Sequence, residues 1–160
     1  MNWDQLAAGE NCPFCAPREE ANAFYDIVLT LEVSSLYLLK NQAYRGHCVL
    51  IYDGRHANRP DDLTLEEWTA YGADLHRVIK PIMSVCEADH INVECMGNQM
   101  PHLHWQVVPR YKSDRRWGMP IWTSTADELH QVRLKEKDRA RLIAEIREAI
   151  EGETPVFWHA

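Results

Sequence analysis

The most regular alternation of apolar and polar residues in the chain lies between Pro101 and Arg110. At the two-residue period of a β-strand, this segment separates into a polar face and an apolar face. The polar face carries His102, His104 and Gln106, and the apolar face carries Leu103, Trp105 and Val107. Any strand with one face in solvent alternates in this way, but two imidazoles and an amide in a row also suit a phosphate chain.

Three further segments have the pattern of β-strands. Branched and aromatic residues are concentrated in 27–40 and in 47–52, and polar and apolar residues alternate in 90–95. We expect Ser34-Ser35 to divide the first segment into two strands or to bend it. Turn residues occupy 41–46 and 53–56, so the segments predict an antiparallel meander. The 90–95 strand is expected to run antiparallel to the 101–110 strand.

Two longer segments have helical periodicity. Thr64 and Glu67 form a capping box in front of a helix whose apolar residues are Leu65, Trp68, Leu75, Val78 and Ile79. Pro81 is expected to end or kink this helix near Lys80, although Ile82 to Val85 could add a last turn. A final amphipathic helix is predicted over 135–150, with Gly152 ending it and an apolar face made of Leu142, Ile143, Ile146 and Ile150. Residues 1–10 predict a short helix or arm.

Length and composition favour one globular domain. The chain has 160 residues, of which 46% are hydrophobic and 26% are charged. We interpret 1–160 as a single domain, with an N-terminal arm over 1–20 and a C-terminal extension over 111–160. No apolar run approaches the roughly 18 residues of a membrane span, and the first residues lack the pattern of a signal peptide. We therefore expect a cytoplasmic protein without a membrane partner.

The charge distribution favours a small anionic ligand over an extended nucleic acid. The formal net charge is −7, which opposes a broad contact with a phosphate backbone. Basic residues are nevertheless clustered directly after the alternating strand, at Arg110, Lys112, Arg115 and Arg116. Such a cluster is common in solvated loops, but beside a histidine-rich strand it indicates an anion site. The Gly97-Asn98-Gln99 connection leads into that strand and can direct backbone N–H groups and amides at a phosphate.

The cysteines divide into a pair and three single residues. Cys12 and Cys15 form a Cys-x-x-Cys motif, a spacing that lets two thiolates bind one tetrahedral metal ion. A redox pair and two structural cysteines are the alternatives, although no βαβ pattern surrounds the motif. Cys48, Cys86 and Cys95 lie in apolar surroundings and are expected to be buried.

Taken together, these motifs resemble the histidine triad (HIT) superfamily. His102-Leu103-His104-Trp105-Gln106 is similar to its His-x-His-x-His signature, with Gln106 in the third place. Gly46-His47, Arg55-His56, Gly97-Asn98 and the Cys12-x-x-Cys15 knuckle occur in the order found in the superfamily. The resemblance implies an α+β fold, with an antiparallel sheet of about five strands, one long helix and a C-terminal helix, in a chain that forms a homodimer.

The resemblance also implies roles for individual residues. Zinc would be held by Cys12, Cys15, His56 and His102, which is the donor set of a closed structural site. His104 would attack the α-phosphorus of a nucleotide and form a covalent nucleotidyl-histidine. Asn98, Gln99 and Arg110 would hold the phosphate oxygens.

Gln106 bears on the class of reaction. An amide can donate and accept hydrogen bonds, but it cannot act as a general acid or base. His-x-His-x-Gln is also the pattern of the uridylyltransferase and dinucleoside polyphosphate phosphorylase branch, so nucleotidyl transfer or phosphorolysis of dinucleoside polyphosphates is the favoured activity. A hydrolase of dinucleoside polyphosphates or nucleoside phosphoramidates is the first alternative, with His47 as a candidate base. A non-catalytic nucleotide-binding module is the second.

Overall fold

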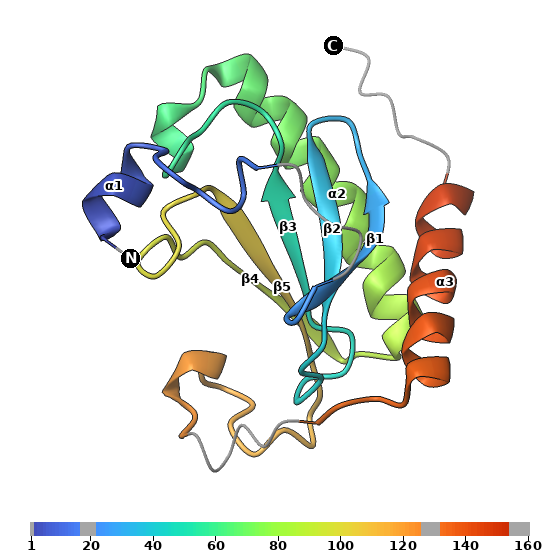
Figure 1. The fold of residues 1–160 in the computed structure, drawn as a ribbon. Coiled ribbons are helices and arrows are strands. Elements are labelled where there is room, and N and C mark those ends of the chain that lie inside the picture. The colour runs from blue at the N-terminus through green and yellow to red at the C-terminus, as the bar shows by residue number, and fades with distance from the viewer. Residues whose placement is uncertain (1, 17–21, 126–131, 154–160) are drawn as a thin grey trace.

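The computed structural model describes residues 2–16, 22–125 and 132–153. The elements follow one another in the order α1 (Trp3–Ala7), β1 (Tyr25–Thr30), β2 (Ser34–Leu39), β3 (Cys48–Tyr52), η1 (Pro60–Asp62), α2 (Leu65–Cys86), β4 (His90–Glu94), β5 (His104–Arg110), η2 (Ile121–Thr123) and α3 (Glu136–Gly152). Figure 1 shows the strands as one sheet with α2 and α3 on the same side of it. No helix among the described residues is long and apolar enough to cross a membrane.

The sheet has five antiparallel strands in the order β1-β2-β3-β5-β4. Its central pair is β3 and β5, in which Ile51 lies opposite His104 and Val49 opposite Gln106. On the other side of β5, Glu94 of the edge strand β4 also lies opposite Gln106. The predicted α+β fold, with its antiparallel sheet and long helix, is therefore confirmed.

The break between the first two strands lies earlier than the sequence indicates. Ser34 and Ser35 are inside β2 and are both buried, and the chain turns in 31–33. The Asp74 carboxylate of α2 accepts hydrogen bonds from the Ser34 hydroxyl at 2.7 Å and from the Val33 N–H at 2.9 Å. Because this carboxylate satisfies the serine hydroxyl, Ser34 can be buried within a strand instead of ending one.

The long helix does not end at its proline. α2 runs from Leu65 to Cys86 with Pro81 inside it, so the helix does not end near Lys80 and includes the additional turn allowed for 82–85. Pro81, Ile82 and Cys86 are buried, and this packing offsets the hydrogen bond that a proline removes from a helix interior. Leu65 is 79% exposed, so its assignment to the apolar face is wrong as well.

The two faces of the sheet carry different side chains. One face packs against α2 and α3 in the main core, to which α3 contributes the predicted Leu142, Ile146 and Ile150. A second, smaller cluster of apolar residues contains Tyr37, Val49 and Ile51, with Phe14 packed against it. Because side chains alternate along a strand, this second cluster lies on the opposite face from Leu36, Leu38 and Leu50 of the core. The N-terminal arm thus covers the face that helices α2 and α3 leave open.

Candidate functional site

The four residues proposed as metal ligands lie together although they are far apart in sequence. The candidate ligand atoms of Cys12, Cys15, His56 and His102 are all within 4.8 Å of one another. The Cys15 sulfur is 3.1 Å from His56 Nδ1 and 3.5 Å from His102 Nδ1, and the Cys12 sulfur is 3.4 Å from His102 Nδ1. The cluster therefore connects the arm to His102, which lies two residues before the start of β5.

Backbone hydrogen bonds orient both imidazoles toward the thiols. His102 Nε2 donates to the Tyr52 carbonyl at 2.8 Å, and His56 Nε2 donates to the Ala7 carbonyl at 3.2 Å. With the proton on Nε2, the lone pair is on Nδ1, the atom that faces the sulfurs. Metal-binding histidines are oriented by carbonyl groups in the same way. Two thiols and two such imidazoles fit a tetrahedral zinc ion, so the cluster is compatible with zinc.

The other three cysteines differ from one another. Cys48 and Cys86 are buried, as predicted, and burial raises the pKa of both thiols, that of Cys86 to about 11. Cys95 is exposed, so the prediction that it is buried is wrong. It directly follows the last residue of β4, which is an edge strand of the sheet.

His104 is held in one orientation at the start of β5. Its Nδ1 donates to the carbonyl of His102 at 2.6 Å, which leaves the lone pair on Nε2. The side chain is 6% exposed, and Phe14 of the arm contacts its ring edge to face, with centroids 5.8 Å apart. Burial lowers the pKa of His104 below 6.5, and the His102 carbonyl partly opposes this shift. The imidazole is therefore neutral near pH 7.

Gln106 is hydrogen-bonded to a second buried histidine. His47 Nε2 donates to Gln106 Oε1 at 2.8 Å. This bond uses the amide oxygen of Gln106, so its N–H groups can donate to another acceptor. Burial lowers the pKa of His47 to about 4. The residue before His47 has to be a glycine: at Gly46 φ is +84°, and a Cβ would overlap the Cys86 thiol. A histidine this weakly basic, with its Nε2 proton in use, does not suit the role of general base.

Replacing His47 with Asn should flatten the dependence of stability on pH between about 4 and 6.5. Folded His47 has a pKa of about 4 against an ordinary value of 6.5, so in this window the unfolded chain binds more protons. The free energy of unfolding therefore falls as the pH falls, by about 3 kcal/mol over the whole window. Urea denaturation at several pH values measures this loss, which should be smaller in H47N. An H76N variant, at an exposed histidine of α2, should behave as wild type, and equal slopes for H47N and wild type would contradict the assignment.

A cavity of about 830 Å³ brings four of the predicted site residues together. His104, Gln106, Asn98 and Gln99 all line it. Its remaining walls are mostly apolar or aromatic and come from the arm, the strands and the C-terminal extension; they are Pro13, Phe14, Asn22, Ala23, Phe24, Tyr25, Leu39, Val49, Met96, Met100 and Trp122. A buried imidazole with a free lone pair and three amides thus share a largely apolar pocket, as in many ligand sites.

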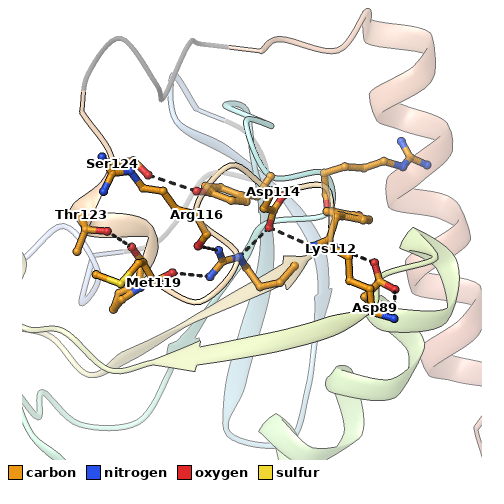
Figure 2. A network of polar contacts seen from close by, with 12 residues as sticks. Asp89, Lys112, Asp114, Arg116, Met119, Thr123 and Ser124 are labelled. Atoms are coloured by element: carbon orange, nitrogen blue, oxygen red, sulfur yellow. Dashed lines mark hydrogen bonds and ion pairs between the residues drawn. The ribbon is translucent and has the colours of Figure 1, made fainter.

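Arg110 does not belong to this cavity. It is 1% exposed, and its guanidinium donates to the Asp114 carboxylate at 2.9 Å and to the carbonyls of Arg116 and Met119 at 2.7 and 2.9 Å. Figure 2 shows these contacts within the network that holds the segment after β5. The structure therefore does not bring Arg110 to the cavity with the other residues expected to hold a phosphate. A buried guanidinium is instead satisfied by the loop folded around it.

The fold can be compared with those of known proteins. No protein-family model and no curated protein matches the chain. Solved structures do match. A histidine triad protein from Marinobacter aquaeolei VT8 has a TM-score of 0.71 at 19% identity, over 81% of this chain and 90% of that one. A hypothetical histidine triad nucleotide-binding protein from Sulfolobus tokodaii strain7 has a TM-score of 0.65 at 20% identity, over 88% and 92%.

The chain has the histidine triad fold. A zinc-bound histidine triad family protein from Mycobacterium smegmatis shares it, with a TM-score of 0.56 at 17% identity over 91% of this chain and 89% of that one. At these identities the likeness concerns the fold.

Within the histidine triad fold, the cavity has four aromatic residues that were not singled out from the sequence; one is Tyr25 of β1, and the other three lie outside the sheet. Phe14 lies between the two cysteines of the knuckle, Phe24 precedes β1, and Trp122 lies in η2. The sequence offers one signal, an unusually aromatic loop over 111–122 that contains Trp122. Nothing in the pattern marks Phe14 or Phe24, because the exposure of an apolar side chain cannot be read from the sequence. Phe24 is 75% exposed and Trp122 is 47% exposed.

Proposed function

We propose that the protein is an enzyme that acts at a nucleotide α-phosphate, by nucleotidyl transfer or by phosphorolysis of dinucleoside polyphosphates. The observation that carries the proposal is the state of His104. Its Nδ1 is bound to the His102 carbonyl, and its ring lines the cavity beside Gln106. The pattern His-x-His-x-Gln, typical of the uridylyltransferase and phosphorylase branch, supports the same reaction class.

The proposed first step is attack by His104 Nε2 on the α-phosphorus. The nitrogen lone pair forms the N–P bond, the bond from phosphorus to the leaving-group oxygen breaks, and its electron pair leaves with that oxygen. Nδ1 keeps its proton, and the His102 carbonyl stabilises the positive charge that develops on the ring. In the second step an oxygen of the acceptor attacks phosphorus, and the N–P bond breaks.

The groups around His104 favour a phosphate over water as acceptor. Gln106 can donate its amide N–H groups to a phosphoryl oxygen, and Asn98 and Gln99 can donate to the others. A phosphate dianion can attack without losing a proton, whereas water needs a base. His47, the candidate base of the hydrolytic alternative, has a pKa of about 4 and its Nε2 proton is bound to Gln106.

The proposal includes a structural zinc ion held by Cys12, Cys15, His56 and His102. Four protein ligands leave no open position, so the ion would supply stability to the arm and take no part in bond making. The zinc-bound neighbour from M. smegmatis and the distances within the cluster support this assignment. The thiols must be reduced to bind the ion, which fits a cytoplasmic setting.

We further propose that the chain acts as one domain and as a homodimer. The arm and the C-terminal extension both contribute residues to the same cavity, which supports a single functional unit. β4 is the edge of the sheet beside β5, so a second copy has a strand with which to pair.

Turnover of diadenosine tetraphosphate with and without added inorganic phosphate tests the reaction class. Phosphorolysis predicts that turnover requires phosphate and that the products contain one phosphate more than the substrate. Turnover at an unchanged rate without phosphate, giving products of hydrolysis, would favour the hydrolase. Tight binding of nucleotide without turnover by phosphate, water or another acceptor would favour the non-catalytic module.

A further inference from the structure

The cavity extends across the sheet and has an aromatic wall at each end. Phe24 and Tyr25 line it at β1, which is one edge of the sheet, and Trp122 lines it at the other edge, where its indole N–H donates to Glu94 of β4. His104 and Gln106 lie on β5, between these two ends. Adjacent strands are about 4.8 Å apart, so four strand spacings separate the ends by roughly 19 Å.

Trp122 is held in place by a contact with β4 and by the packing of its own segment. Its indole N–H is bound to the Glu94 carboxylate, and Glu94 lies directly opposite Gln106 in the sheet. Ile121, the preceding residue, is 4% exposed and anchors η2. The loop before η2 is bound to the buried Arg110 through the Met119 carbonyl. A ring that is fixed in this way but 47% exposed can receive a ligand with little loss of conformational entropy.

We propose that Trp122 is the stacking platform for the base on the leaving group of a two-headed substrate. The inference rests on the proposed function, because that function places the reacting phosphorus at His104. The transferred nucleoside then occupies the end lined by Phe24 and Tyr25. The leaving group extends past Gln106 toward Trp122, where a second nucleobase meets the exposed face of the indole. Trp122 therefore makes the cavity selective for dinucleoside polyphosphates over mononucleotides.

Binding of two probes to wild type and to W122A tests the inference. The first probe is a methylene-bridged, non-cleavable analogue of diadenosine tetraphosphate, and the second is AMP. Stacking of a base on an aromatic side chain predicts that W122A binds the dinucleotide analogue about tenfold more weakly, with AMP affinity unchanged. W122F, which keeps an aromatic face, should retain most of the affinity. F24A should weaken the binding of both probes, since both carry the first nucleoside.

Trp117 supplies the matched control. It is a 40% exposed tryptophan of the same segment and contacts His90, with ring centroids 6.4 Å apart, and it does not line the cavity. W117A should therefore bind both probes as wild type does. Equal preference for the dinucleotide in W122A and wild type, with AMP still bound, would overturn the role of Trp122 and leave the proposed function standing. Failure of wild type to bind either probe would overturn the proposed function as well.

Discussion

Replacing His104 with Ala is expected to abolish the covalent nucleotidyl adduct and to lower turnover by about 10⁴-fold or more. The carbonyl of His102 holds Nδ1 of the native ring, and the opposite nitrogen is the proposed nucleophile at the cavity wall. Gln106 and Asn98 cannot replace this atom, because an amide nitrogen has no available lone pair. The measurement is to quench the protein with an α-labelled nucleotide at alkaline pH, because the N–P bond of the adduct is acid-labile, and then to weigh the peptide that contains position 104.

The result has to be separated from a loss of folding or of binding. H104A should bind AMP within a few-fold of wild type, because the apolar walls of the cavity remain. H76A removes an exposed histidine of α2 and should form the adduct at the wild-type rate. An adduct that survives in H104A, or turnover within about tenfold of wild type, would rule out His104 as the nucleophile.

The fold was largely predictable because its strands carry strong local signals. Alternation in 101–110 and 90–95 fixes which residues can face the core, and the capping box at Thr64 fixes the start of α2. The errors occur where tertiary contacts override local rules. Pro81 stays inside α2 because its surroundings are buried, and Ser34 stays inside β2 because Asp74 of a distant helix accepts a hydrogen bond from its hydroxyl.

The site was predictable where the chemistry is carried by residue type and spacing. The Cys-x-x-Cys knuckle and the alternating histidines pointed to the cluster and to the cavity wall that the structure brings together. Residue type and spacing do not place Arg110. It is at the end of the strand that carries the histidines, but its guanidinium points into the protein, onto the carbonyls of the following loop. Trp122 could not be assigned to the cavity from the sequence, because its position depends on a contact between its indole and Glu94 of β4.

Replacing Cys15 with Ser is expected to remove bound zinc and to lower the melting temperature by about 10 °C. The Cys15 sulfur lies close to both imidazoles, and a serine hydroxyl is a poor substitute for a thiolate ligand of zinc. The free energy of metal binding contributes to folding, and a loss of about 3 kcal/mol corresponds to a shift of this size in a chain of this length. Metal content by mass spectrometry and thermal unfolding by circular dichroism measure both effects.

C95S is the matched control, because Cys95 is an exposed cysteine outside the cluster and should keep both the ion and the melting temperature. A chelator should lower the melting temperature of wild type and C95S but leave that of C15S unchanged. The effect should extend to the cavity, since Phe14 lies between the two cysteines and packs against both His102 and His104. C15S should therefore bind AMP more weakly than C95S. One equivalent of zinc retained by C15S would show that the ion does not depend on this thiol and would refute the proposed ligand set.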